Sequence, residues 1–274
     1  IFVCNDQRWD FLFHNLGGGK FEEAGLQAGV ACNFSGAPTS SMGADAGDYD
    51  NDGRLDLLVT DYFNEMCVLH HNLGDGQFED AAAQAGLGVR ATAYVKWGCG
   101  MVDFDSDGWK DIFIGCGHIY KDIDVVSGGG AYELRPILFR NLGNGRFDNV
   151  TDSGGDGMRV RMVARGIAFD DLDNDGRVDV VVLNRDRPPV VLRNESDTGN
   201  HWLQLRLIGR KSNRDGVGAQ VRVIAGSLIQ IDEVHSGRGY QSHFGSRLHF
   251  GLNKQQRVDR IEVRWIGGGV DVLH

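Results

Sequence analysis

The sequence contains only 4 prolines, and it has no uninterrupted apolar run of the roughly 18 residues that a membrane-spanning helix requires. Its 41% hydrophobic residues can form a sizeable core, which excludes a disordered chain. Basic residues are also scarce: 28 Lys and Arg stand against 38 Asp and Glu, for a formal net charge of −10. This deficit argues against nucleic acid as a partner, because a phosphate-binding surface is basic.

Cysteines are few and follow no metal-binding or redox spacing. The five cysteines include no CxxC pair, and they are Cys4, Cys32, Cys67, Cys99 and Cys116. An odd count leaves at least one thiol unpaired, and we expect most of them to be small buried hydrophobic residues. The sequence also lacks G-x-S-x-G, HExxH, Walker and GxGxxG signatures in their required contexts. No motif therefore predicts a catalytic centre.

Charge is distributed unevenly along the chain. Residues 197–274 carry 11 Lys and Arg against 7 Asp and Glu, whereas residues 1–196 carry 17 against 31. The polar segment Asn194–Asn200 lies between the two parts and is expected to join them. The sequence thus predicts two domains, residues 1–196 and 197–274, of which the first is strongly acidic and the second mildly basic.

Glycine is abundant, with 40 residues, and much of it belongs to an internal repeat. The string D-x-D-x-D-G-x-x-D occurs three times, at Asp48–Asp56, Asp103–Asp111 and Asp171–Asp179, which we name loops 1, 2 and 3. Each loop is followed by a second string, VLHHNLGDGQF, ILFRNLGNGRF or VVLRNES, and a further copy, FLFHNLGGGKF, ends at Phe21. Such repeats of short strand-like segments, without helical periodicity, are typical of β-propeller blades.

Short apolar segments flank the loops and are predicted to be β-strands. The segments Leu57–Val59 and Val180–Leu183 are expected to be buried on both faces, and each N-L-G-x-G string to form a hairpin turn whose following Phe acts as an anchor. The middle repeat contains an insertion, Gly117–Glu133. Ile1 occupies the place that Leu57 has in its repeat, so we expect the repeats to begin upstream of this chain.

The three loops carry the ligands of a calcium site. Aspartates at positions 1, 3 and 5 can point inward, glycine at position 6 permits a sharp turn, residue 7 offers its backbone carbonyl, and the aspartate at position 9 closes the shell. Hard oxygen ligands favour Ca²⁺ over zinc or copper, so the sequence predicts about three calcium ions. The predicted ligands are Asp48, Asp50, Asp52, Arg54 and Asp56; Asp103, Asp105, Asp107, Trp109 and Asp111; and Asp171, Asp173, Asp175, Arg177 and Asp179.

Two other interpretations of the loops fit less well. An EF-hand requires a glutamate at position 12 and a helix after it, whereas position 12 here is Val59, Ile114 or Val182 in a strand-like segment. Acidic turns without a metal are the remaining alternative, because Asp and Gly favour turns. Three intact copies at matching places in the repeat favour the metal.

These motifs resemble a known family. The loops followed by LFRNLGNGRF resemble the FG-GAP/VCBS repeats of calcium-stabilised β-propellers, related to those of integrin α-chains. The segments NHWLQLRL from Asn200, NRDGVGAQVRV from Asn213, SGRGYQSHFGSRLHFGL from Ser236 and VDRIEVRW from Val258 resemble the ASPIC/UnbV domain. The combination is similar to the cartilage acidic protein/UnbV family. The resemblance implies an extracellular or cell-surface protein with no established catalytic residues, and a propeller of which this chain holds about three and a half blades.

Independently of the resemblance, residues 197–274 show the period of two that half-buried strands produce. Apolar residues alternate with polar ones in Leu203–Leu207, Val217–Val223 and Ile261–Trp265. The sequence therefore predicts an all-β chain, a partial calcium-binding β-propeller followed by a small antiparallel β-sandwich-like domain.

Candidate partner contacts lie in the middle repeat. Because position 7 coordinates through its carbonyl, its side chain is expected to be free, and loop 2 has Trp109 there. The insertion adds His118, Tyr120 and Tyr132, and rigid aromatic side chains beside an inserted loop suit a contact surface. The alternatives are that Trp109 packs under the insertion as local core and that His118 is an ordinary loop residue. The adjacent histidines 70 and 71 are expected to face opposite sides of a strand, which argues against a shared site.

Three classes of function remain. The chain is predicted to be a non-catalytic extracellular interaction or adhesion module, stabilised by calcium, that presents propeller loops to a protein or glycan partner. The alternatives are a structural subunit of a larger extracytoplasmic assembly, contacting neighbouring subunits, and a propeller enzyme of the polysaccharide lyase or dehydratase type. We expect an extracellular, cell-surface or periplasmic location.

Overall fold

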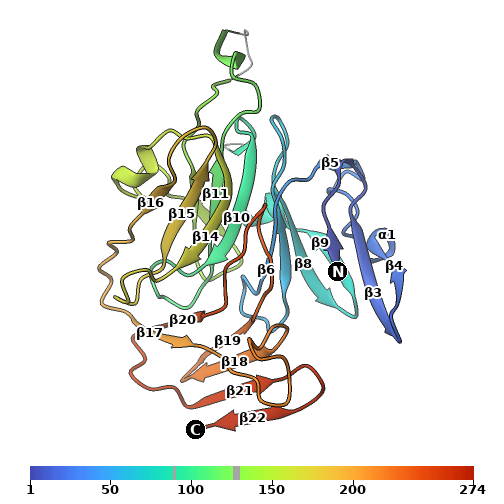
Figure 1. The fold of residues 1–274 in the computed structure, drawn as a ribbon, viewed down its shortest axis with the longest axis vertical. Coiled ribbons are helices and arrows are strands. Elements are labelled where there is room, and N and C mark those ends of the chain that lie inside the picture. Colours follow the sequence, from blue (N-terminus) through green and yellow to red (C-terminus); the bar gives the residue numbers. More distant parts are fainter. Residues whose placement is uncertain (89–90, 126–129) are drawn as a thin grey trace.

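The computed structural model describes residues 1–88, 91–125 and 130–274 of the chain. These residues form antiparallel β-sheets with short helices between them, so the all-β prediction is confirmed (Figure 1). The described helices are α1 (Gly25–Ala28), α2 (Ala82–Ala85), η2 (Ile123–Val125) and η3 (Asp156–Arg159). In this part of the chain, no helix has the length and apolar character needed to cross a membrane.

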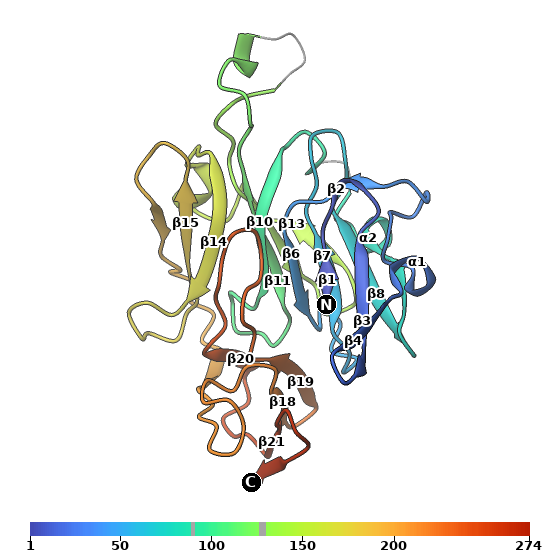
Figure 2. The same cartoon turned by 45° about the vertical axis from the view of Figure 1, so that its right-hand side comes forward.

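Four sheets of antiparallel strands follow one another along the first two thirds of the chain. The first contains β1 (Phe2–Val3), β3 (Phe11–Gly17) and β4 (Lys20–Glu23), and the second β6 (Ala44–Gly47), β7 (Asp56–Val59), β8 (Val68–Gly74) and β9 (Gln77–Asp80). The third contains β10 (Lys96–Val102), β11 (Asp111–Cys116), β12 (Ile137–Asn141) and β13 (Phe147–Asn149), and the fourth β14 (Ala164–Asp170), β15 (Asp179–Asn184) and β16 (Val190–Leu192). The strands β2 (Asp6–Arg8) and β5 (Thr39–Ser40) pair separately. Figure 2 shows the four sheets side by side.

The repeated strings occupy equivalent places in these sheets. Loops 1, 2 and 3 connect β6 to β7, β10 to β11 and β14 to β15, the first two strands of their sheets. The N-L-G-x-G string forms the β8–β9 hairpin, in which Gly74 pairs with Gln77 and the turn residues Asp75 and Gly76 have φ of 52° and 73°. These left-handed conformations suit glycine and aspartate. The predicted hairpin is confirmed.

Neighbouring sheets pack face to face, and β11 lies between two of them. All six residues of β11 are buried. Ile112 and Ile114 join a cluster with the second sheet, whereas Phe113 joins a cluster with the fourth, because successive strand residues point to opposite faces. In Leu57–Val59, the last two residues are buried as predicted, whereas Leu57 is half-buried. The prediction for Val180–Leu183 is wrong on one face: Val181 is half-buried and Leu183 is 52% exposed, because β15 belongs to the last of the four sheets.

The five cysteines are free thiols, three of them buried and two half-buried. Burial raises the pKa of Cys67 to about 12, which makes its thiol unreactive. The buried cysteines Cys99 and Cys116 belong with Cys67 to the cluster between the second and third sheets. They behave as the small hydrophobic residues that the sequence predicts.

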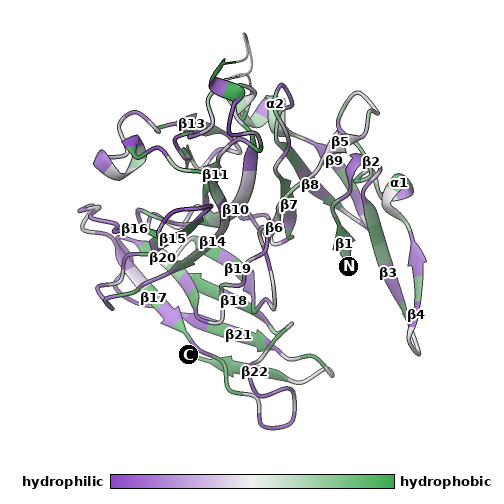
Figure 3. Ribbon diagram, turned by 45° about the horizontal axis from the view of Figure 1, so that its top comes forward, coloured by the Kyte–Doolittle hydropathy of each residue, from purple (hydrophilic) through white to green (hydrophobic). Residues whose placement is uncertain are grey.

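Residues 197–274 form two further antiparallel sheets around a core of their own. Their strands alternate between hydrophobic and hydrophilic residues (Figure 3). Val221 and Val223 are buried while Arg222 between them is exposed, so the predicted period of two is confirmed. The sheets consist of β17 (His201–Leu205) with β20 (Leu248–Asn253), and of β18 (Gln220–Ala225), β19 (Leu228–Glu233), β21 (Arg260–Arg264) and β22 (Val270–Leu273).

A long connection between β19 and β20, residues 234–247, leaves this carboxyl-terminal domain and runs along the first strands of the second, third and fourth sheets (Figures 1 and 2). We name it the strap. Gly239 forms a β-bridge with Ala44 of β6, and Phe244 packs edge-on against Phe169 of β14 at 4.8 Å between ring centroids. The strap thus contacts several sheets at once.

Candidate metal sites

The first aspartate of each loop organises the turn through backbone amides. In loop 1 the carboxylate of Asp48 accepts hydrogen bonds from the amides of Asp52 and Gly53, at 3.1 and 2.9 Å. The equivalent bonds in loop 2, to Asp103, measure 3.1 and 2.8 Å, and those in loop 3, to Asp171, measure 3.0 and 2.9 Å. The three loops therefore share one backbone conformation, which glycine at position 6 permits with φ between 88° and 94°.

The aspartate at position 9 ties the loop to the hairpin strand of the same sheet. Its carboxylate accepts a hydrogen bond of 2.8 Å from the backbone amide of the repeated asparagine in every repeat; the pairs are Asp56–Asn72, Asp111–Asn141 and Asp179–Asn194. The other carboxylate oxygen accepts a bond from the amide at position 2. Positions 1 and 9 are thus held before any ligand binds.

The repeated asparagine also joins neighbouring sheets. The side-chain amide of Asn141 donates to the carbonyl of Tyr49 in loop 1, at 2.8 Å. That of Asn194 donates to the carbonyl of Phe104 in loop 2, also at 2.8 Å. These two asparagines are bonded through the backbone to their own loop and through the side chain to the preceding loop, so adjacent loops are connected.

Carboxylates converge in all three loops. Ligand oxygens of positions 1, 3 and 9 lie within 4.8 Å of one another in loops 2 and 3, and positions 1, 3 and 5 do so in loop 1. In loops 2 and 3 the aspartate at position 5 lies outside this group, and its carboxylate accepts a hydrogen bond from the amide at position 7. The donor set consists of hard oxygens, which suits calcium. The structure therefore brings together most of the aspartates that the sequence predicts.

Burial disfavours the charge of these carboxylates. It raises the pKa of Asp48 to about 7 and that of Asp103 to about 8, with neighbouring aspartates adding to the rise. Burial likewise raises the pKa of Asp56 to about 6. A divalent cation would offset both the lost hydration and the mutual repulsion, because it places opposite charge within reach of every carboxylate.

A basic residue precedes each repeated asparagine and faces the loop, and sequence reasoning missed it. The Nδ1 atom of His71 lies 3.5 Å from Asp50 and 3.3 Å from Asp56. Arg140 pairs with Asp105 at 2.7 Å, and Arg193 with Asp173 at 2.8 Å. The signal was present in the strings themselves, where the residue before Asn is His, Arg and Arg after loops 1, 2 and 3. His71 thereby joins the loop 1 cluster and gives it a nitrogen donor.

The side chains at position 7 were expected to be free, and this prediction is wrong: all three make contacts within their own repeat. The Nε atoms of Arg54 and Arg177 donate to the carbonyls of Asn72 and Asn194, at 2.6 and 2.8 Å, and both guanidinium groups pair with the aspartate at position 5 of their own loop. The indole of Trp109 packs on Gly143 in the β12–β13 turn. These side chains cover the hairpin because the loop folds back on it.

The four predicted contact residues do not lie together. Trp109 precedes β11, whereas the insertion that carries His118, Tyr120 and Tyr132 follows it, so the strand separates them. Residues 126–129 of the insertion lie outside the described residues. His118 is buried and its Nδ1 accepts a hydrogen bond from the Tyr120 amide at 3.1 Å, while Tyr120 itself is 63% exposed. The single surface predicted for Trp109 and the insertion is therefore two separate surfaces.

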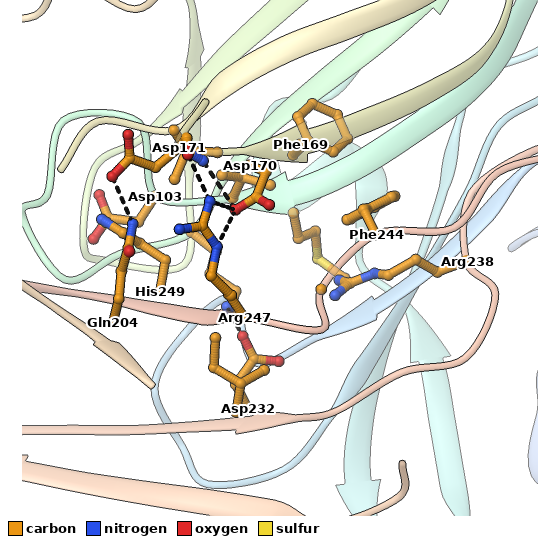
Figure 4. A pocket seen from close by; sticks show the side chains of 16 residues that line it. Asp103, Phe169, Asp170, Asp171, Gln204, Asp232, Arg238, Phe244, Arg247 and His249 are labelled. Atoms are coloured by element: carbon orange, nitrogen blue, oxygen red, sulfur yellow. Dashed lines mark hydrogen bonds and ion pairs between the residues drawn. The ribbon is translucent and has the colours of Figure 1, made fainter. Parts of the chain in front are cut away.

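A small cavity of about 40 Å³ lies where β10 and β14 meet the carboxyl-terminal domain (Figure 4). Two pairs of its charged side chains contact each other. Lys110 contacts Asp232 at 2.7 Å, and Arg247 donates to Asp170 at 3.0 Å. A cavity of this size has room for little more than water.

The chain is similar to known proteins in both of its parts. Residues 1–59 match the FG-GAP-like repeat, and residues 209–274 match the model described as ASPIC and UnbV. The resemblance predicted from the motifs is confirmed. Cartilage acidic protein 1 of Homo sapiens is 26% identical over 279 aligned residues, and those of Mus musculus and Xenopus tropicalis are 25% and 24% identical. Each comparison covers 98% of this chain but only 39–40% of the relative, so the chain spans about two fifths of the length of these relatives.

Proposed function

We propose that the chain is a calcium-stabilised, non-catalytic extracellular interaction module. It would bind about three calcium ions, one in each loop, and consist of about three and a half propeller blades in residues 1–196 and a β-sandwich-like domain in residues 197–274. The observation that carries the proposal is the convergence of three carboxylates within 4.8 Å in every loop, on one shared hydrogen-bonding framework. Acidic turns that bind no metal would not require the same cluster of three carboxylates in every repeat.

Calcium is the ion that the donor set favours. Every predicted ligand is a carboxylate or a backbone carbonyl, and Ca²⁺ takes six to eight such oxygens in flexible geometry. Loop 1 differs because His71 lies within 3.5 Å of Asp50. We expect loop 1 to bind calcium less tightly than a loop with oxygens alone, since imidazole suits transition metals better.

The partner would be a protein or a glycan outside the cell. The relatives carry the name cartilage acidic protein, which names no enzymatic activity. Among the described residues of the insertion, Tyr120 and Val125 are 63% and 85% exposed, so this loop is one surface open to a partner. The location outside the cytoplasm is part of the proposal and accords with calcium affinities that suit extracellular concentrations.

A structural subunit of a larger assembly is the second candidate, and the first sheet supports it. Phe11, Leu16 and Phe21 of this sheet are 41%, 58% and 47% exposed. Exposed apolar side chains on a sheet favour packing against another sheet. A polysaccharide lyase or dehydratase function is less well supported, because the described cavity of about 40 Å³ has room for little more than water.

The test is calcium binding and its effect on stability. Titration calorimetry of chelator-stripped protein should give about three ions per chain, and chelation with EDTA should lower the melting temperature by mass action. Asp50→Asn should lower it in excess calcium as well. The matched control is Asp75→Asn in the β8–β9 turn, which removes the same charge at an exposed aspartate outside the loops. An unchanged melting curve on chelation, or equal effects of the two variants, would refute the proposal.

A further inference from the structure

The carboxyl-terminal domain rests on loop 2. The carbonyl of Asp105 accepts hydrogen bonds from the side chains of Thr198 and Asn200, both at 2.9 Å. The carbonyl of Ser106 accepts one from the backbone amide of Asn253 at the end of β20, at 2.9 Å. At Gly251 the backbone of β20 passes so close to loop 2 that a Cβ atom would lie 1.9 Å from the carboxylate of Asp103. Only glycine fits there.

The same domain also rests on loop 3. The side-chain amide of Gln204 donates to the carboxylate of Asp171, the aspartate at position 1, at 2.8 Å. His249 lies 3.0 Å from the carbonyl of Gly176, at position 6. The indole of Trp202 covers Gly176, and a Cβ atom there would lie 1.9 Å from the ring. Strands β17 and β20, which carry these three side chains, therefore form a seat on loops 2 and 3.

Loop 1 has the same conformation but lacks this cover. In the part of the chain that the structure describes, no hydrogen bond or ion pair joins residues 48–56 to residues 197–274. The glycines at position 6 make the comparison plain. A Cβ atom on Gly53 would meet nothing within 4 Å, whereas one on Gly108 would lie 2.7 Å from Leu228. The domain thus touches two of the three loops that carry clustered carboxylates.

We propose that cations bound in loops 2 and 3 hold the carboxyl-terminal domain on its seat. The acceptors of the seat are the carbonyls of positions 3, 4 and 6 and the carboxylate of position 1, all within the turn that the cation would organise. Hydrogen bonds hold the carboxylates of positions 1 and 9 without a cation, so loss of the cation frees mainly position 3. Movement of position 3 displaces the backbone carbonyls of the turn that serve as acceptors. This inference rests on calcium binding by the loops, as proposed above. By linkage, the seated domain must raise the calcium affinity of loops 2 and 3 by the same factor.

The strap provides a second attachment. Its last residue, Arg247, donates to Asn174 of loop 3 at 3.0 Å, but its bonds to β6 involve no loop residue. Arg238 forms a buried ion pair with Asp45 of β6, and Gly239 donates to the carbonyl of Ala44 at 2.7 Å. The side chain of Arg238 is 6% exposed and that of Asp45 is fully buried. We therefore expect loss of cations to release the β17–β20 seat while the strap stays bound to β6 at Arg238 and Gly239.

Hydrogen exchange of the full chain measures the seat directly. In millimolar calcium, Asp105→Asn and Asp173→Asn, each at position 3, should speed the exchange of amides in β17 and β20 about tenfold, because local opening controls exchange there. Asp50→Asn is the matched control: it removes the same charge at the same position of loop 1. It should leave β17 and β20 as protected as in the unchanged chain, and none of the three variants should expose the amide of Gly239.

The possible outcomes distinguish failure of this inference from failure of the proposed calcium binding on which it rests. Calorimetry that finds no calcium bound refutes the proposed function and the present inference with it. Calcium bound in about three sites, with equal β17 and β20 protection in Asp50→Asn and Asp105→Asn, refutes the inference alone. A converse test is Trp202→Ala, which leaves every loop residue in place. It should weaken calcium binding at one site several-fold, and unchanged affinity at all sites would also overturn the inference.

Discussion

Alanine substitutions of the glycine at position 6 test how closely the carboxyl-terminal domain packs against the loops. Gly53 and Gly176 have φ of 88° and 89°, so the conformational penalty for alanine is nearly the same at both. That penalty is roughly 1–2 kcal/mol for a left-handed residue. Only the surroundings differ, because a Cβ atom would face open space at Gly53 but would lie 1.9 Å from the indole of Trp202 at Gly176. The difference between Gly176→Ala and Gly53→Ala thus isolates the contact.

The expected magnitude follows from that distance. A carbon atom cannot remain 1.9 Å from Trp202, so either the indole or loop 3 must move. Forced overpacking of this kind costs about 1–3 kcal/mol. Gly176→Ala should therefore destabilise the chain by about 2–5 kcal/mol, and Gly53→Ala by about 1–2 kcal/mol. The extra loss corresponds to a melting temperature lower by about 2–12 °C for a chain of this size.

Thermal unfolding followed by circular dichroism in saturating calcium provides the measurement, and a double-mutant cycle supplies the decisive control. In the Trp202→Ala background the indole is gone, so Gly176→Ala should show only the left-handed penalty, as Gly53→Ala does. Equal effects of the two glycine substitutions in the unchanged background would refute the reasoning. So would a Gly176→Ala destabilisation that persists in full after Trp202 is removed.

Two further predictions concern charge. Burial raises the pKa of Asp61 to about 8, so the folded chain keeps a proton on this carboxyl that the unfolded chain releases at lower pH. The free energy of unfolding should therefore fall as pH rises from about 4 to about 8. In melting curves recorded with saturating calcium, Asp61→Asn should reduce this fall by a few kcal/mol. Arg140 pairs with Asp105 at 2.7 Å and would repel a cation bound in loop 2. Arg140→Gln should therefore increase the calcium affinity of loop 2 about threefold to tenfold, as measured by calorimetry. A lower affinity would contradict this prediction and show that the arginine holds the ligands of the site in place.

The elements that the sequence predicts well depend on local chemistry. The turn at Asp75 and Gly76, the alternation around Arg222 and the conformation of the loops are each set by residues within about ten positions of one another, through backbone preferences and the period of a strand. Such features repeat along the chain, and the repetition reveals them. The convergence of aspartates, at positions 1, 3 and 5 in loop 1 and at positions 1, 3 and 9 in loops 2 and 3, is part of this local pattern, so the candidate sites could be found without a structure.

What the sequence does not predict is the placement of the carboxyl-terminal domain. Gly251 stands inside a strand, which indicates close approach of another group, but nothing in the string LHFGLN identifies that group as Asp103. The pairing of Arg238 with Asp45 spans 193 residues and follows no period. Contacts of this kind form between two sheets that are distant in the sequence, so they produce no periodic pattern in the sequence of either sheet.

The basic residue before each asparagine was missed for a different reason. His71, Arg140 and Arg193 stand at one place in the repeat, but they differ in side-chain type and none is a calcium ligand of the expected kind. Their common property is that they are basic, which is not apparent from a motif defined by identical residues. The structure shows its use, since each lies within 3.5 Å of a loop carboxylate.

The asparagine links place a limit on how independent the loops can be. Asn141 connects loop 2 to the carbonyl of Tyr49 in loop 1, and Asn194 connects loop 3 to Phe104 in loop 2. Loops 1 and 2 share a second bond, in which the side chain of Asn51 donates to the carbonyl of Gly108 at 2.9 Å. A single hydrogen bond contributes about 0.5–1.5 kcal/mol, so each such link transmits a coupling of at most this order between neighbouring loops. Among the described residues, no hydrogen bond joins loop 1 directly to residues 197–274, whereas loops 2 and 3 contact the carboxyl-terminal domain directly. Emptying loop 1 must therefore affect the seat far less than emptying either of the others.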